Sequence, residues 1–172
     1  HFAPAFLFFD YDEKQHQTPF VGLNYLWMLP FLVLGAYYLT VKGESKGMKL
    51  VWWWLLLAPL PAAVTRGVPH AGRTEAMTVP LMVMAALGMR FGLKRWWLKL
   101  GVGVWAGLSL IHFGHQYWVH LPHERSVAWQ YGRKEMTEYL VKHKDEYDRV
   151  VVSTKLEWPY IFMLYYSKYE PA

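Results

Sequence analysis

The chain has 172 residues, of which 54% are hydrophobic and 18% aromatic, and its formal net charge at pH 7 is +5. The absence of cysteine excludes disulfides and thiolate metal sites. Most of the positive charge comes from lysines and arginines in short connectors between apolar stretches, which argues against nucleic acid as a partner.

The chain opens with a short apolar run between a proline and a group of acidic residues. The run Phe6–Phe9 follows Pro4 and is far too short to cross a membrane. A run of this kind is typical of a short helix that lies in a membrane interface. We expect the acidic side chains that follow it to belong to a solvated loop and assign none of them as a general base. They are Asp10, Asp12 and Glu13.

Four apolar stretches then follow, over residues 22–41, 50–65, 76–89 and 100–121. A helix needs about 20 apolar residues to cross about 30 Å of hydrocarbon. The first and fourth stretches meet this length easily, and the second is somewhat short. The third meets it only if Thr74, Glu75 and the segment through Leu93 are included. The pattern predicts a mainly α fold, with a polytopic transmembrane helical bundle of four spans over residues 22–121.

Basic residues alternate between the two sides of these stretches. The first connector holds Lys42, Lys46 and Lys49, and the third holds Arg90, Lys94, Arg95 and Lys99. Lysine and arginine collect on the cytoplasmic side of membranes. We therefore expect both connectors in the cytoplasm. The segment 1–21, the loop 66–73 and the tail 122–172 are then extracytoplasmic.

The fourth apolar stretch contains glycines at helical spacing. Gly103 and Gly107 form a G-x-x-x-G pair, and Gly101 precedes them. Small residues at this spacing permit two helices to approach closely. The pattern favours packing of this helix within one bundle over dimerisation.

The polar tail over residues 122–172 has a different periodicity. A helical pattern runs from about Ser126 to Lys144, and the β-branched run Arg149–Ser153 has the length of a strand. Residues 154–157 have capping-box spacing, and Trp158–Pro159 opens an apolar helical stretch through Tyr166. Helix, strand and helix predict the start of a small extracytoplasmic α/β domain. We expect it to be incomplete, because a single strand cannot form a sheet.

The loop between the second and third stretches carries the strongest chemical signal. It contains Arg66, His70 and Arg73. A guanidinium can hold a phosphate through two hydrogen bonds, and an imidazole can add a hydrogen bond or a proton. Basic residues at a membrane surface can also simply anchor to anionic headgroups. Both interpretations remain open, and Glu75 either pairs locally or positions Arg73.

Four histidines near the end of the fourth stretch form a candidate metal cluster. His112 and His115 share a helix face, whereas His120 and His123 lie on either side of Pro122. A zinc site needs three or four converging ligands in a defined geometry. We expect these histidines to make packing or interfacial contacts, and we predict neither a metal site nor a cofactor.

Three segments in collinear order, covering most of the chain, resemble a known family. The string Leu60–Thr65 followed by Pro69-His70-Ala71-x-Arg73 resembles the late outer loop of GT-C glycosyltransferases. It is most similar to bacterial relatives of the protein O-mannosyltransferase and aminoarabinose-transferase group. Two further regions resemble the preceding outer segment and span, and the extracytoplasmic tail, of that group. They are Phe2–Asp10 with Gly22–Gly35, and Trp129–Glu135 with Tyr147–Asp148 and Pro159–Phe162. Gly72 departs from the larger residue found in many relatives.

The resemblance implies an integral membrane enzyme of the bacterial cytoplasmic (inner) membrane. Such enzymes move a sugar from a polyprenyl-phosphate carrier to an acceptor protein, lipid or glycan on the extracytoplasmic face. Arg73, His70 and Arg66 would hold the carrier phosphate among the membrane lipids. The family's catalytic carboxylate lies in a first outer loop, which we expect upstream of His1, so we expect this chain to be the C-terminal part of a longer enzyme. The alternative is a non-enzymatic polytopic membrane protein whose outer domain binds a partner or a polysaccharide.

Overall fold

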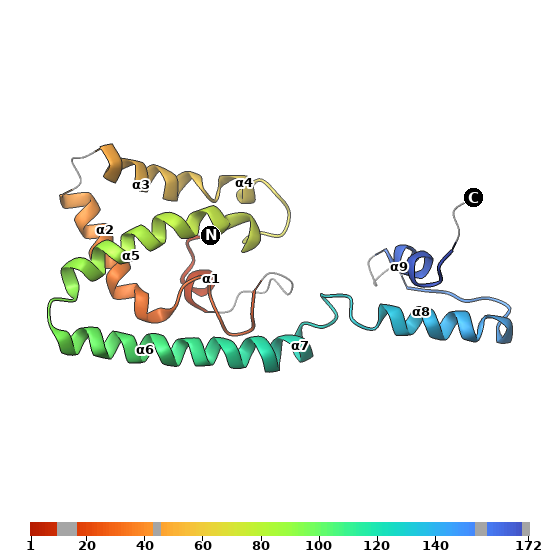
Figure 1. The fold of residues 1–172 in the computed structure, drawn as a ribbon. Coiled ribbons are helices and arrows are strands. Elements are labelled where there is room, and N and C mark those ends of the chain that lie inside the picture. The colour runs from red at the N-terminus through yellow and green to blue at the C-terminus, as the bar shows by residue number, and fades with distance from the viewer. Residues whose placement is uncertain (10–16, 43–45, 154–157, 170–172) are drawn as a thin grey trace. The chain divides into compact units, whose positions relative to one another are not determined.

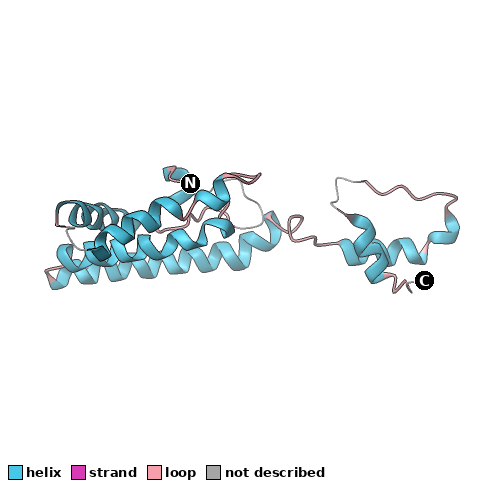
Figure 2. Cartoon of the chain, turned by 90° about the horizontal axis from the view of Figure 1, so that it is seen from above, coloured by secondary structure: helices cyan, strands magenta, loops and turns pink. Residues whose placement is uncertain are grey.

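The computed structural model describes residues 1–9, 17–42, 46–153 and 158–169. These residues form helices joined by turns and loops, and none of them forms a β-strand (Figures 1 and 2). The chain divides into two compact units, His1–Glu124 and Arg125–Ala172. The residues predicted to bind phosphate all belong to the first unit.

The first unit contains most of the helices. In chain order they are α1 (Pro4–Phe8), α2 (Leu29–Val41), α3 (Lys46–Leu57), α4 (Leu60–Ala63), α5 (Thr78–Gly92), α6 (Trp96–His115) and α7 (Leu121–Glu124). Short 3-10 helices precede α2 and α5, namely η1 (Leu26–Met28) and η2 (Gly72–Met77). A proline stands in the first turn of α1, α2 and α4, where its missing N–H removes no helical hydrogen bond. The short helix α1 confirms the helix expected near Phe6.

The core of this unit forms where α2 and α5 cross at two glycines. A Cβ added to Gly35 would collide with the carbonyl of Met84, and one added to Gly88 would collide with the carbonyl of Phe31. With no side chain at either point, the two backbones touch and the flanking apolar residues interlock. The buried core consists of Met28, Phe31, Leu32, Leu39, Leu55, Met77, Leu81, Met84 and Ala85.

Helix α6 has different surroundings, because none of its 20 residues is buried. It continues through a π-helical turn, Gln116–His120, into α7. Pro122 has no N–H to donate to the carbonyl of Trp118, and its ring crowds that carbonyl in a regular helix. The wider turn directly before it accommodates the proline without ending the helix.

The predicted bundle of four transmembrane spans is wrong. Among the described residues, no helix combines the length and the apolar character needed to cross a membrane. Helices α2, α3 and α5 have 13, 12 and 15 residues. At 1.5 Å per residue they extend about 18–23 Å, less than the ~30 Å of a hydrocarbon core.

The apolar stretches are longer than the helices because backbone breaks divide them. Residues 22–28 form bends and η1 before α2 begins, and the second stretch is interrupted by a turn at Ala58 and Pro59. In the third, α5 begins only at Thr78, after η2. Helix α6 is long, but it carries Lys99 near one end and two histidines at the other.

The second unit packs α8 (Arg133–Lys142) against α9 (Pro159–Tyr166), with the 3-10 helix η4 (Lys144–Glu146) following α8. Arg133 is buried, and its guanidinium lies 5.7 Å from the ring centroid of Phe162 on α9. This cation–π contact joins the two helices. The helix predicted after Trp158 is confirmed by α9.

The predicted α/β character of the tail is wrong. Arg149–Ser153 forms no strand, and Val151 is 81% exposed. A strand requires a neighbour to pair with, and the described residues supply none. The helix expected from Ser126 begins only at Arg133, because Gln130 (φ 63°) and Gly132 (φ 86°) have left-handed backbones that interrupt it. The predicted capping box at residues 154–157 lies outside the described residues.

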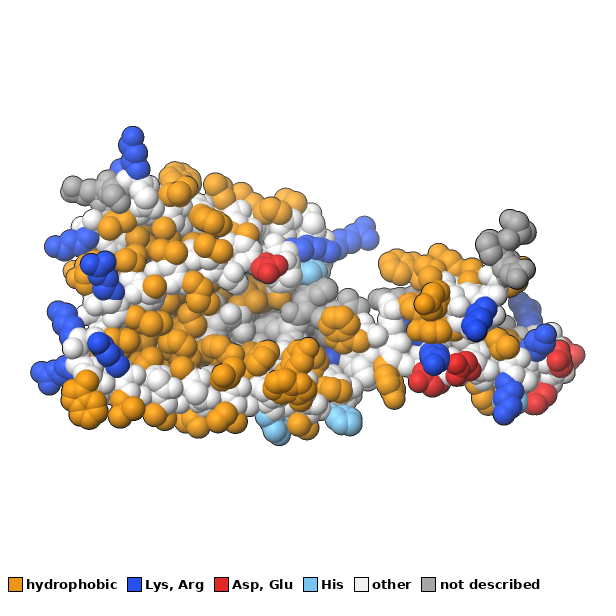
Figure 3. All heavy atoms as spheres, viewed as in Figure 1, with side chains coloured by type: hydrophobic (Ala, Val, Ile, Leu, Met, Phe, Trp, Pro, Cys, Tyr) orange, Lys and Arg blue, Asp and Glu red, His pale blue; other side chains and the backbone are white. Residues whose placement is uncertain are grey.

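Charged side chains of the first unit gather at opposite ends of its helices. The α2–α3 and α5–α6 connectors lie at one end, and the loop between α4 and η2 lies at the other (Figure 1). Figure 3 shows basic side chains gathered at both ends and hydrophobic side chains over the surface between them. The two sets of basic residues distinguished in the sequence are therefore separated by the length of the helices.

Candidate functional site

The loop from Thr65 to Arg73 folds around the guanidinium of Arg73. The Nη1 atom of Arg73 donates to Oγ1 of Thr65 at 2.7 Å and to the backbone carbonyl of Arg66 at 2.9 Å. Both protons of this nitrogen are thus used inside the loop. Among the described residues no acceptor is placed against Nε or Nη2, and the Arg73 side chain is exposed. One edge of the guanidinium is fixed and the other faces outward.

Thr65 connects this arginine to helix α4. Its hydroxyl donates to the carbonyl of Ala62 at 2.8 Å, and its oxygen accepts from Arg73. A threonine hydroxyl has one proton and two lone pairs, so the two bonds are compatible. Gly67, with φ 75°, reverses the chain after Arg66. Because the bond between Arg73 and Thr65 joins residues eight apart, it fixes the loop as well as the arginine.

His70 holds the other side of the loop. Its Nδ1 accepts the backbone N–H of Arg73 at 3.3 Å, and its carbonyl accepts the hydroxyl of Thr74 at 2.8 Å. An imidazole that accepts at Nδ1 carries its proton on Nε2 when it is neutral. The ring lies beside Gly72, where an added Cβ would be 3.6 Å from Cε1 of His70. The structure thus brings His70 and Arg73 together.

Arg66 and Glu75 have smaller parts in this arrangement. Arg66 contributes its backbone carbonyl, while its side chain is exposed. Glu75 accepts the hydroxyl of Thr78 through its backbone carbonyl at 2.6 Å. The hydrogen bonds that orient Arg73 come from Thr65 and from the backbone of Arg66, so the sequence-based alternative in which Glu75 positions Arg73 is not needed.

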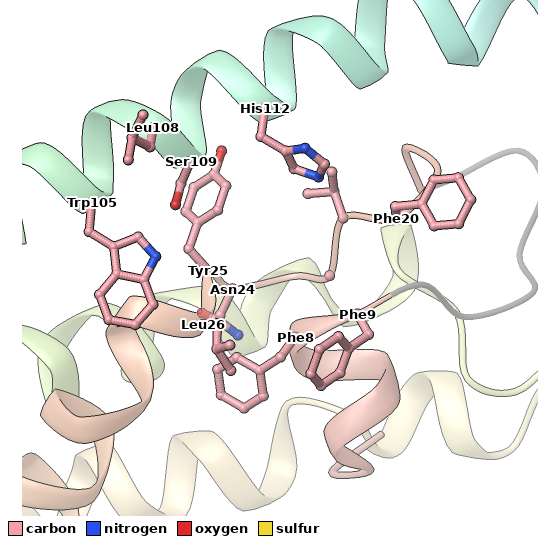
Figure 4. Close-up of a pocket in the computed structure, with 12 residues that line it drawn as sticks. Phe8, Phe9, Phe20, Asn24, Tyr25, Leu26, Trp105, Leu108, Ser109 and His112 are labelled. Carbon is pink, nitrogen blue, oxygen red and sulfur yellow. The ribbon is translucent and has the colours of Figure 1, made fainter.

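A second site that the sequence did not reveal is a hollow of about 390 Å³ between α6 and the segment 20–26. Figure 4 shows Trp105, Ser109 and His112 pointing from α6 toward that segment. Its other lining residues are Phe8, Phe9, Phe20, Val21, Gly22, Asn24, Tyr25, Leu26 and Leu108. These positions come from three distant parts of the chain, so no local motif marks them.

Backbone contacts fix the side of this hollow opposite α6. The N–H of Asn24 donates to the carbonyl of Leu7 at 2.7 Å, and a Cβ on Gly22 would collide with the backbone of Phe8. The buried amide of Gln17 adds two bonds, to the carbonyls of Phe9 at 3.1 Å and Val21 at 2.8 Å. Burial raises the pKa of the Tyr25 hydroxyl above its usual value.

The histidines near the end of α6 do not converge. The rings of His115 and His120 are 5.1 Å apart between centroids, and Nδ1 of His120 lies 2.6 Å from Oε1 of Glu124. His112 instead lines the hollow. Within the described residues, no group of three or more histidine, aspartate or glutamate side chains could hold a metal ion. The acidic residues Asp10, Asp12 and Glu13 lie outside the described residues.

Comparison with known proteins gives no match. No family model, no curated protein and no solved structure is similar enough to this chain to be matched to it.

Proposed function

We propose that this chain takes part in glycosyl transfer from a polyprenyl-phosphate-linked sugar, and that Arg73 binds the carrier phosphate. The observation that carries the proposal is the fixed guanidinium. Nη1 is held by Thr65 and by the Arg66 carbonyl, so Nε and Nη2 form an outward edge of two parallel donors. Such an edge matches two oxygens of a phosphate. Holding the arginine in advance lowers the entropy lost on binding.

The surface of the first unit supports a location at a membrane. Helix α6 buries none of its residues, and Leu100, Leu110 and Ile111, which do not line the hollow, are each more than 50% exposed. Exposed apolar surface of this extent is typical of sites that contact lipid or another protein. A polyprenyl chain is itself apolar, so its phosphate would meet Arg73 at the edge of such a surface. We propose membrane lipid as a partner on this ground.

The proposed chemistry is displacement at the anomeric carbon of the carrier sugar. A carboxylate removes the proton of the acceptor hydroxyl, whose oxygen forms the new bond to that carbon. The bond from the carbon to the phosphate oxygen breaks, and the phosphate leaves with the electron pair. Arg73 stabilises the negative charge that develops on the leaving phosphate. We assign no residue of this chain as the carboxylate.

Co-sedimentation with vesicles tests the phosphate-binding step directly. The chain is mixed with phosphatidylcholine vesicles that contain either polyprenyl phosphate or an equal charge of phosphatidylglycerol. Arg73→Ala should weaken binding to polyprenyl phosphate by about 10- to 150-fold, because a hydrogen bond to a charged group contributes about 1.5–3 kcal/mol. Arg73→Lys should restore it only in part, since an ammonium lacks the two parallel donors.

Thr65→Val and two control substitutions separate phosphate recognition from general electrostatic attraction. Arg95→Ala removes an exposed arginine from the other end of the helices and should leave binding unchanged. Thr65→Val removes the anchor of Arg73 but no charge, and should weaken binding by several-fold, whereas Thr40→Val removes only a similar hydroxyl bond within α2. Equal affinity for phosphatidylglycerol and polyprenyl phosphate would mean that the loop only anchors to anionic headgroups. That result would refute the proposal.

A further inference from the structure

The hollow between α6 and the segment 20–26 contains a buried polar side chain to which the described residues offer no partner. Asn24 is 3% exposed, and within the described part of the chain neither its amide nitrogen nor its amide oxygen has a hydrogen-bond partner. A buried polar group left unpaired costs about 1–3 kcal/mol, so such groups are rare unless they have a role. The backbone N–H of the same residue donates to the carbonyl of Leu7, so hydrogen bonding to the described residues fixes the backbone of Asn24 and not its side chain.

The remaining lining residues indicate what kind of ligand would complete the site. The hydroxyls of Tyr25 and Ser109 and the imidazole of His112 add hydrogen-bonding groups, and they come from both sides of the hollow. The described lining residues include no lysine, arginine, aspartate or glutamate. A volume of about 390 Å³ lies in the range of small-molecule sites, which are mainly apolar with a few placed polar groups.

We propose that this hollow binds an uncharged sugar ring, and that the amide of Asn24 pairs with the ring's hydroxyls. A hydroxyl both donates and accepts, so adjacent hydroxyls can satisfy the amide NH₂ and the amide oxygen together. Trp105 and Phe8 supply apolar surface for the C–H faces of the ring. A planar base edge would satisfy Asn24 equally well but would leave the polar groups on α6 unused. The choice of a sugar as the ligand rests on the proposed glycosyl transfer. The presence of a pocket with an unpaired amide does not depend on that proposal.

Access to the amide requires a side chain to move, because both amide atoms are buried. Leu26, which lines the hollow next to Tyr25, is 43% exposed and can change rotamer without entering the core. Binding would then replace an unpaired amide by a paired one. The site therefore predicts opposite effects of one substitution on stability and on binding.

Asn24→Leu tests this prediction because leucine has nearly the same size and no hydrogen-bonding groups. Removing an unpaired buried amide should leave the melting temperature of the ligand-free protein unchanged or raise it. Gln116→Leu is the matched control, since Gln116 is also buried, its amide oxygen has no partner among the described residues, and it does not line the hollow. Saturation-transfer NMR on the intact chain then measures binding of methyl mannoside, methyl glucoside, glucosamine, glucuronic acid and uracil.

The neutral methyl glycosides should bind the wild-type chain and the Gln116→Leu variant alike. They should bind Asn24→Leu about tenfold more weakly, which corresponds to a loss of about 1.4 kcal/mol of hydrogen bonding. Glucosamine and glucuronic acid should bind more weakly than the neutral rings. Absence of sugar binding, equal binding by Asn24→Leu, or a preference for uracil would each overturn the inference. Sugar binding together with a failed polyprenyl-phosphate experiment would refute the proposed function alone, and the reverse result would refute this inference alone.

Discussion

Helices α5 and α6 follow one another in the chain and are both apolar, yet their surroundings are opposite. Helix α5 buries Pro80, Leu81, Met84, Ala85 and Gly88, whereas α6 buries nothing. Both contain glycines, but only those on the α2–α5 crossing touch another backbone. An added Cβ at Gly101, Gly103 or Gly107 on α6 would meet no atom of the described residues within 4 Å. A glycine pattern therefore permits close packing without producing it, and the prediction that Gly103 and Gly107 pack within the bundle is wrong.

The test with the largest expected effect replaces one leucine on each helix by alanine. Leu81 on α5 is 6% exposed and Leu110 on α6 is 65% exposed. Leu81→Ala should lower the free energy of unfolding by about 2–5 kcal/mol, because it leaves a cavity. Leu110→Ala should change it by less than about 0.5 kcal/mol. Chemical denaturation of the two variants in one buffer measures both values. Similar losses would show that α6 is covered by a partner under those conditions.

A smaller test adds a single methyl group to a glycine on each helix. Gly88→Ala forces the backbones of α2 and α5 apart and should cost about 1–3 kcal/mol, in the range of overpacked cores. Gly103→Ala has open space around it and should stabilise the protein by about 0.5–1 kcal/mol, because alanine favours a helix over glycine. Melting temperatures should therefore move in opposite directions. Movement in the same direction would contradict the geometry of the α2–α5 crossing.

The smallest effect concerns Tyr25, which lies in the hollow beside α6. Burial raises its pKa above 10.0 in the folded state. The unfolded chain then loses this proton first, so the stability linked to Tyr25 is present below the unfolded pKa and is lost as the pH rises through the folded pKa. The free energy of unfolding should fall more steeply above pH 10 in the wild type than in Tyr25→Phe. Identical alkaline slopes would indicate that α6 leaves Tyr25 fully solvated.

Local signals in the sequence predicted the short helices, and longer-range features escaped prediction. The helices after Pro4 and Trp158 follow from a proline in the first turn and an apolar run. The prediction of four membrane spans failed because hydropathy measures how apolar a stretch is. It does not detect the breaks in the helical backbone at η1 and at Pro59. The prediction of a strand in the β-branched run after Arg149 failed because a strand needs a neighbouring strand to pair with, and no single segment can supply one.

The candidate sites also divide into features that local sequence signals predict and features that depend on distant parts of the chain. Arg73 and His70 were recognisable because their side chains have phosphate-binding chemistry and lie close together in the sequence. The role of Thr65 in holding Arg73 was not recognisable, since an isolated threonine has many ordinary uses. Asn24 gave no signal at all. Its significance depends on the absence of a hydrogen-bond partner among the described residues. That absence becomes visible only when α1, the segment 20–26 and α6 are brought together.

The π-helical turn at Gln116–His120 acts as a one-residue insertion in an otherwise continuous helix. In a regular α-helix, residues five apart are separated by about 140° around the axis, at 100° per residue. Here His115 and His120 are five apart and their rings are neighbours, at 5.1 Å between centroids. Deleting Val119 would remove the extra residue and restore a regular helix, in which the two histidines become four apart and differ by about 40° around the axis. The π turn therefore absorbs one residue and keeps both imidazoles on one face of the helix.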